Sequence, residues 1–179
     1  MIGNDIIDLS LAKTQSNWKR KGFLEKQFTL KEQTIIHASN NPFEVVWRLW
    51  SMKESAYKIV VQQQNRRFFA PRKFECEVVS ETKGKVFFED QIFDAETITN
   101  RKYIYTSINK SQFKQIWKKE KPKRETMLLW IDNVLGISSS KIEKNAFGVP
   151  NIYNNARQIS ESCSIAHHGN YSAIEFIPV

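Results

Sequence analysis

The chain has 179 residues and a formal net charge of +8, because 27 lysines and arginines outnumber 19 aspartates and glutamates. With 41% hydrophobic and 12% aromatic residues it can build the core of one ordinary domain, which excludes two large independent domains. The positive charge favours anionic partners such as phosphates, nucleic acid or acidic proteins, without choosing among them.

Neither a membrane segment nor a disulfide is expected. No apolar run approaches the roughly 20 residues that a membrane-spanning helix needs. The first residues, MIGNDIIDLS, carry acids where a secretory leader would carry a basic start. Cys76 and Cys163 lie far apart and lack metal-ligand spacing, which favours free thiols in a reducing compartment. We therefore expect a cytoplasmic protein.

The first predicted elements are a short strand and a helix. Residues 2–9, IGNDIIDL, partly alternate between apolar and polar positions, as a strand does, and a basic polar stretch from Lys13 to Lys21 follows. Thr29 precedes Glu32 by three residues, which is the spacing of a capping box. This spacing predicts a helix from about Leu30 to Ala38.

The strongest helix signal runs from Phe43 to about Val61. This stretch has no glycine or proline, and its apolar residues recur at three- and four-residue intervals. Strand-like runs separated by polar loops follow over residues 74–108 and predict an antiparallel sheet. The predicted fold class is therefore α+β, with an antiparallel sheet packed against a long helix.

A second helix and a closing hairpin are expected toward the end of the chain. A basic run, Lys118 to Arg124, leads into a predicted helix from about Glu125 to Leu135, which Gly136 ends in the manner of a C-cap. The last segment, SCSIAHHGNYSAIEFIPV, fits two strands joined by a turn at Gly169 and Asn170. No linker marks a domain boundary.

The stretch WSMKESAYK places charged residues on the long helix. Glu54 and Lys58 are four residues apart, so both project from one helical face, while Lys53 points about 100° around the axis. Such a pair is more often solvated surface than a site. The apolar neighbours Trp50 and Tyr57 suggest instead that these charges lie at the edge of a core, where functional sites occur.

Two acids of the first strand are further candidates. Asp8 is more simply explained as a turn cap or a surface residue than as part of a site. If Asp5 and Glu54 converged, their oxygens together with water would form the shell that Mg²⁺ prefers, with room for phosphate oxygens. Spacing in the sequence does not decide whether they converge.

Histidines and basic clusters carry weaker signals. His167 and His168 precede the expected turn, where a histidine is more often a satisfied polar residue, although it can present an imidazole to an anion. Aromatic residues beside basic ones, as in NRRFFAPRKF, also allow a basic nucleic-acid-binding module. That alternative would leave Asp5 and Glu54 without a role.

Five segments together resemble the 4′-phosphopantetheinyl transferases. GNDIIDL is similar to the family strand GxDIxxI, WSMKESAYK to W-S-x-K-E-[SA]-x-x-K, and SIAHHGNYSAIEF to S-x-S-H-x-x-x-Y-A-x-A. FLEKQFTLKEQ and AFGVPNI resemble the family's F-T-x-x-E and G-x-P stretches. The segments follow the family's order over residues 3–176, and the KES motif is the specific one.

Because the histidine segment closes the chain, the sequence resembles the single-unit holo-acyl-carrier-protein synthase type. It is longer than that type, through extra sheet and helix over residues 74–135. The resemblance implies one domain over residues 1–179 that associates with copies of itself to complete its sites. A trimer is among the arrangements it implies.

The resemblance also implies a reaction: transfer of phosphopantetheine from coenzyme A to a serine of an acyl or peptidyl carrier protein, with release of 3′,5′-ADP. Asp5 and Glu54 match the family's Mg²⁺ ligands, and Glu54 is also a candidate base. Lys58 would bind phosphate, and Lys53 would either neutralise the same charge or brace the helix. His167 would bind a coenzyme A phosphate from the neighbouring subunit. Displacement at phosphorus suits these groups, since it mainly needs positioning and charge neutralisation.

Some assignments stay open. Arg66, after the long helix, is a further candidate for binding coenzyme A. Ile7 stands where larger family members carry a third acidic ligand, so a water or Asp8 would complete the metal shell. Ala166 replaces the usual serine before the histidine. The carrier and its pathway (fatty acid, polyketide or peptide synthesis) are not specified, and a non-catalytic binder of carrier protein or coenzyme A is a further alternative.

Overall fold

A computed structural model describes residues 1–118 and 124–179 of the chain. The strands of the first sheet are β1 (Gly3–Asp8), β2 (Glu75–Val78), β3 (Lys83–Phe88), β4 (Gln91–Thr99) and β5 (Tyr103–Ile108). They are antiparallel in the order β1-β5-β4-β3-β2, so the N-terminal strand forms one edge. The antiparallel sheet expected over residues 74–108 is confirmed.

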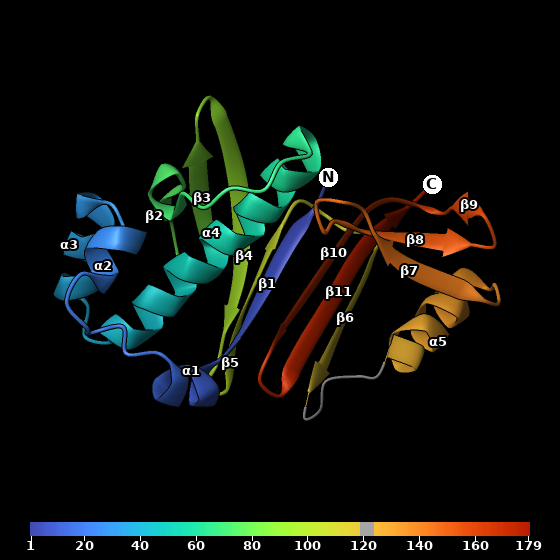
Figure 1. The fold of residues 1–179 in the computed structure, drawn as a ribbon. Coiled ribbons are helices and arrows are strands. Elements are labelled where there is room, and N and C mark those ends of the chain that lie inside the picture. Colours follow the sequence, from blue (N-terminus) through green and yellow to red (C-terminus); the bar gives the residue numbers. More distant parts are fainter. Residues whose placement is uncertain (119–123) are drawn as a thin grey trace.

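The second half of the chain forms two smaller antiparallel sheets. Their strands are β6 (Phe113–Lys118), β7 (Ser140–Lys144), β8 (Pro150–Asn154), β9 (Arg157–Gln158), β10 (Ser160–His168) and β11 (Tyr171–Pro178). One sheet has the order β10-β11-β6 and the other β7-β8-β9. The expected closing hairpin is β10 and β11, which stand beside β1 in Figure 1.

The helices are α1 (Leu9–Gln15), α2 (Phe23–Gln27), α3 (Leu30–Ala38), α4 (Pro42–Gln64) and α5 (Arg124–Leu135), with a short 3-10 turn at Pro71–Lys73. The three helices predicted from the sequence, near residues 30–38, 43–61 and 125–135, are present as α3, α4 and α5. Helix α3 begins with the expected capping box between Thr29 and Glu32. Gly136 follows α5 with a φ of 64°, the left-handed conformation of a C-cap. Within the described ranges, no helix is long and apolar enough to cross a membrane.

Several elements were not predicted. Helices α1 and α2 lie on either side of the basic stretch after the first strand, and β6 lies directly before the basic run of residues 118–124. The run from Lys118 to Arg124 lies mostly outside the described residues. Cys76 and Cys163 are both free and buried, as expected.

Helix α4 lies across one face of the first sheet, and the main core forms between them (Figure 1). Apolar residues of α4, including Val46, Leu49, Met52 and Ala56, are fully buried against this sheet. A second core forms between α5 and the C-terminal strands. A third, smaller cluster of Ile6, Tyr103, Tyr105, Ala166, Tyr171 and Ala173 joins the two halves.

Strand β1 packs on α4 at unusually short range. Side chains alternate along a strand, so Gly3, Asp5 and Ile7 share one face. A Cβ atom at Gly3 would lie 2.0 Å from the backbone oxygen of Ser55 in α4. Only glycine permits this approach. The next side chain on the same face is Asp5, which is thereby brought against α4.

Lys53 is buried in a structural ion pair. Its ammonium lies 2.8 Å from the carboxylate of Glu32 in α3, and both side chains are almost fully buried. It also donates to the backbone oxygens of Pro71 and Phe74. The second oxygen of Glu32 accepts the N–H of Cys76 at 2.8 Å. Lys53 therefore joins α3, α4 and the start of β2, and the expectation that it binds coenzyme A is corrected, because its three protons are already donated.

We expect Gly3→Ala to lower the free energy of unfolding by about 2–3 kcal/mol, because the added methyl group overpacks against a backbone atom that cannot turn aside. Urea unfolding followed by tryptophan fluorescence measures this. Glu96→Ala, on the exposed face of β4, serves as the control and should change stability by less than about 0.5 kcal/mol. Unchanged stability in Gly3→Ala would contradict the close packing of β1 on α4.

We expect Lys53→Met to cost about 3 kcal/mol, because it leaves the Glu32 carboxylate buried without its cation. The matched control is Lys31→Met, which removes an ion pair with Glu75 whose side chains are 62% and 40% exposed. Exposed pairs contribute little, so the control should change stability by at most about 1 kcal/mol. Equal losses in the two variants, measured by urea unfolding, would contradict a structural role for Lys53.

Candidate active site

Asp5, Glu54 and Lys58 meet where β1 crosses α4. Lys58 Nζ lies 3.9 Å from Asp5 Oδ1. Glu54 stands one turn before Lys58 on the same helical face. Glu54 interacts electrostatically with Lys58, and its negative charge raises the pKa of Asp5. The convergence that spacing alone left open is therefore present in the fold.

Lys58 also connects the two halves of the chain. Its ammonium donates to the backbone oxygen of Asn4 on β1 at 2.6 Å and to that of Ile165 on β10 at 3.2 Å. Burial lowers the pKa of Lys58, and the charges of Asp5 and Glu54 oppose this shift. The ammonium is thus fixed in place beside both carboxylates.

Burial dominates the electrostatics of the carboxylates. It raises the pKa of Asp5 to about 7, with Lys58 acting in the opposite direction and Glu54 adding to the rise. Burial also raises the pKa of Glu54, again opposed by Lys58. The positive charge of Lys58 thus offsets only part of the rise in pKa that burial causes in Asp5 and Glu54. A further positive charge would stabilise the ionised forms of both carboxylates.

The donor set fits a magnesium ion shared with a substrate. Asp5 Oδ2 is buried and has no hydrogen-bond partner among the described residues, although a carboxylate oxygen is a strong acceptor. Within residues 1–118 and 124–179, no group of three or more histidines, cysteines or acids could hold a metal by itself. Mg²⁺ is commonly held by one or two carboxylates, with water and substrate phosphates completing its shell.

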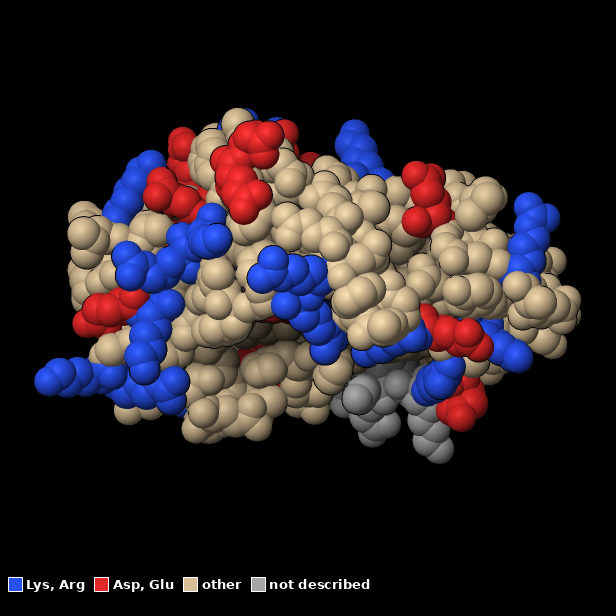
Figure 2. Space-filling view, turned by 45° about the horizontal axis from the view of Figure 1, so that its top comes forward, with Lys and Arg blue, Asp and Glu red and all other residues tan. Residues whose placement is uncertain are grey.

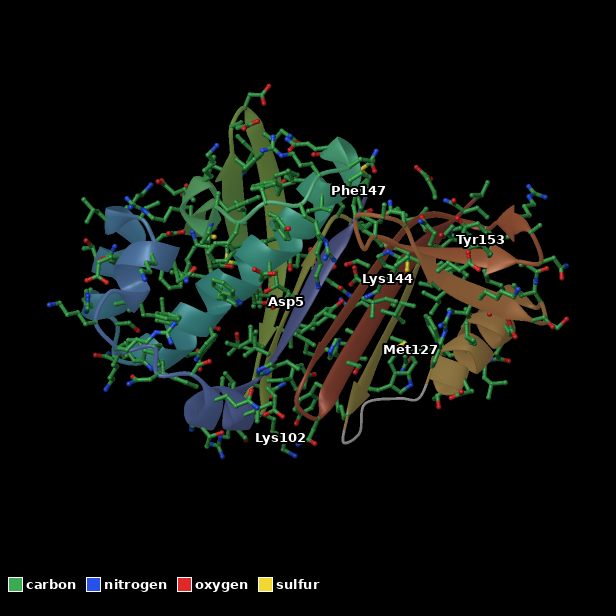
Figure 3. All side chains as sticks on the ribbon, in the orientation of Figure 1. Asp5, Lys102, Met127, Lys144, Phe147 and Tyr153 are labelled. Carbon is green, nitrogen blue, oxygen red and sulfur yellow. The ribbon has the colours of Figure 1, made fainter. Side chains whose placement is uncertain are left out.

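A pocket of about 210 Å³ opens beside these groups. Helix α4 contributes Glu54, Tyr57, Lys58 and Gln62 to its wall, and the segment from β7 to β8 together with β10 forms the other side. Lys144 and Phe147, labelled in Figure 3, belong to that opposite wall. Figure 2 shows a hollow near the middle of one face with blue basic side chains beside it.

The pocket is lined by more cations than the motifs indicated. Lys58, Arg67, Lys144 and His167 all reach it, against the single acid Glu54. Arg67 donates to the backbone oxygen of Phe147 at 2.6 Å, which ties the loop after α4 to the loop before β8. This cationic lining suits a ligand with several phosphates.

His167 lines the same pocket as Glu54 and Lys58 of its own chain. Strand β10 lies next to β1 within one chain, which brings His167 to this pocket. A contribution of His167 to the site of a neighbouring subunit stays a prediction. Lys144 was not recognised in the sequence. Its place two positions before the AFGVP segment was the only available signal.

Two other expected residues lie elsewhere. Arg66 is exposed after α4 and does not line the pocket, whereas its neighbour Arg67 does. Asp8 caps α1 by accepting the N–H groups of Ser10 and Leu11, and its other oxygen accepts the N–H of Asn170. Asp8 also faces away from Asp5 in the strand, so its expected role as a turn cap is confirmed and its role as a metal ligand is corrected.

A second, more apolar hollow of about 190 Å³ adjoins the first. It is lined by Lys53, Glu54, Tyr57, Phe68, Phe69, Ala70, Pro71 and Phe74. Glu54 and Tyr57 belong to both hollows, so they stand on the ridge between a cationic and an aromatic surface.

Comparison with known proteins identifies the family. None of the curated proteins compared with the chain matches it significantly. The crystal structure of a holo-[acyl-carrier-protein] synthase from Thermotoga maritima is similar, with a TM-score of 0.45 and 13% identity over 86% of this chain and 82% of that chain. A family profile described as the 4′-phosphopantetheinyl transferase superfamily matches residues 1–116, which include Asp5, Glu54 and Lys58. Since the match covers more than half of the sequence, the chain belongs to the 4′-phosphopantetheinyl transferase superfamily.

Proposed function

We propose that this protein transfers 4′-phosphopantetheine from coenzyme A to a serine of an acyl or peptidyl carrier protein, as a holo-acyl-carrier-protein synthase, with Mg²⁺ as its cofactor. The observation that carries the proposal is the unpartnered, buried oxygen of Asp5 beside Lys58, which together with Glu54 lines a pocket rich in basic side chains. Phosphoryl chemistry needs such a concentration of fixed charge.

Each residue has a distinct part in the proposed reaction. The serine oxygen of the carrier forms a bond to the phosphorus next to the pantetheine arm, and the bond from that phosphorus to the leaving 3′,5′-ADP breaks. Glu54 accepts the serine proton as the general base. Lys58 neutralises charge on the phosphate oxygens. When bound, Mg²⁺ would be held by Asp5 and Glu54 and would add Lewis-acid polarisation of the same oxygens.

The two hollows suggest how the substrates divide. The cationic pocket with Arg67, Lys144 and His167 would take the phosphates of coenzyme A. The hollow lined by Phe68 and Phe74 would take the less polar pantetheine arm. Glu54, on the ridge between them, would then face the scissile bond.

The remaining parts of the proposal concern the whole molecule. The pocket draws its lining from residues 54–67 and 144–167 of one chain, which supports the proposal that one chain can hold the whole site. We infer that residues 1–179 act as one domain, joined by the cluster around Tyr105. A homo-oligomer, a trimer included, and a cytoplasmic location stay predictions.

We expect an apo carrier protein to gain one phosphopantetheine group on incubation with this protein, coenzyme A and Mg²⁺, as measured by intact-protein mass spectrometry. Glu54→Gln and Asp5→Asn keep the side-chain shapes but remove the charges, so each should lower the rate at least about a hundredfold. Chelating the metal should stop transfer, and added Mg²⁺ should restore it.

The matched control is Asp94→Asn, which changes an acid that is 84% exposed on β4 and should leave the rate unchanged. Folding of every variant is checked by circular dichroism. Absence of transfer to several carriers, with intact binding of coenzyme A, would contradict an enzyme and indicate a non-catalytic binder.

A further inference from the structure

The two main sheets meet edge to edge without backbone pairing. Strand β1 forms one edge of the first sheet, and β10 forms one edge of the second. Among the described residues, no backbone-to-backbone hydrogen bond joins these two strands. An unpaired edge leaves backbone donors and acceptors that need partners when they are buried.

Side chains of β10 supply acceptors to β1 at a constant offset. The N–H of Ile2 donates to Ser162 Oγ at 3.0 Å, and the N–H of Asn4 donates to Ser164 Oγ at 3.0 Å. The N–H of Asp8 donates to His168 Nδ1 at 2.9 Å. Each pair is separated by 160 positions, so the two strands run in parallel and the acceptors form a regular side-chain ladder.

One position of the ladder has no side-chain acceptor. By the same offset, Ile6 stands opposite Ala166, which carries no hydroxyl. This is the residue at which the sequence departs from the family's serine. The ladder is therefore held at its far end by His168 alone.

Helix α4 completes the edge from the other side. Gln62 Nε2 donates to the oxygen of Ile2 at 2.7 Å, and its Oε1 accepts the hydroxyl of Ser162 at 2.7 Å. Lys58 donates to the oxygen of Asn4, directly before Asp5. Side chains of β10 on one side and of α4 on the other therefore fix the position of β1.

We propose that His168 is a positioning residue, which keeps β1 and its Asp5 in register with Lys58 and His167 by accepting the N–H of Asp8. Its effect on catalysis rests on the proposed transferase function. His168 Nδ1 accepts a proton only in the neutral imidazole, because a protonated ring carries donors at both nitrogens. The bond is therefore lost when His168 is protonated.

Five titratable groups lie around His168 at this end of the ladder. Asp8 lies against it from β1, Tyr171 pairs with it on β11, and Tyr103 of β5 stacks on Tyr171. Lys118 of β6 lies over Tyr103, and His167 is its neighbour on β10. Burial raises the pKa of Tyr171 above its ordinary value of 10, so this neighbour stays neutral near neutral pH.

The direction of the pH effect follows from linkage. Burial lowers the pKa of His168 below its ordinary value of 6.5, although Asp8 opposes the shift. The unfolded chain then binds more protons than the folded protein as the pH falls below 6.5. The stability from this contact is present above that pH and is lost as the pH falls through the lowered pKa.

The test compares His168→Asn, whose Oδ1 accepts without titrating, with His168→Ala, which has no acceptor. Urea unfolding is measured from pH 5.5 to 8 for both variants and the unchanged protein. As the pH falls from 8 to 5.5, we expect the unfolding equilibrium constant of the unchanged protein to rise about fivefold more than that of His168→Asn. Other groups, Asp5 included, titrate in all three proteins and cancel in the difference. Parallel pH profiles of the unchanged protein and His168→Asn would overturn the contact.

Carrier modification then tests positioning. At pH 7.5, His168→Ala should lower kcat about tenfold, and His168→Asn should restore it to within about threefold of the unchanged protein. An unchanged kcat in His168→Ala, with the stability difference present, would overturn positioning and leave a purely structural bond. If the unchanged protein transfers nothing, the proposed function fails, while the unfolding profiles still decide whether His168 holds β1.

Discussion

The approach of β1 to α4 is the constraint on which the site depends. Gly3 lets the strand lie against the backbone of Ser55, and the next side chain on that face is Asp5. A wider spacing would separate Asp5 from Glu54 and Lys58, which come from the helix. Strand β1 is also an edge strand, and side chains of β10 accept the N–H groups of Ile2, Asn4 and Asp8 along that edge. The N-terminal strand is thus fixed between two layers that belong to different halves of the chain.

Lys53 and Lys58 lie on the same helix but in different environments: Lys53 in a buried ion pair and Lys58 at the candidate site. Lys53 points toward α3, where Glu32 and two carbonyl groups use all its protons. Lys58 points toward β1 and the pocket, where two carbonyl groups hold it but Asp5 and Glu54 face it. The rotation of about 100° per residue in a helix separates these environments.

Much of the fold could be predicted because its signals are local. The capping box of α3, the periodicity of α4 and the turn between β10 and β11 each depend on residues close in sequence. Asp5, Glu54 and Lys58 were found through motifs, and their convergence could not be predicted, since it depends on how β1 packs on α4. The pairing of Lys53 with Glu32, 21 positions away, leaves no local trace.

The second half was harder to predict for a related reason. Strand β6 is rich in basic residues that also suit a surface loop, and β7 to β9 are short strands whose alternation is weak. Because these elements place β10 against β1, the sequence could not indicate that His167 would reach the pocket within its own chain. Arg66 and Arg67 are neighbours in a loop, and only the bond to Phe147 distinguishes them.

We propose that one chain holds the whole site, and mixing two impaired variants tests this most directly. Glu54→Gln and His167→Ala are each assayed for carrier modification by mass spectrometry, then co-refolded in equal amounts and assayed again. If each chain completes its own site, the mixture should show only the average of the two separate rates. If neighbouring chains shared sites, about a quarter of all sites in a randomly assembled mixture would combine unaltered Glu54 and His167. Recovery of activity toward that fraction would contradict the account.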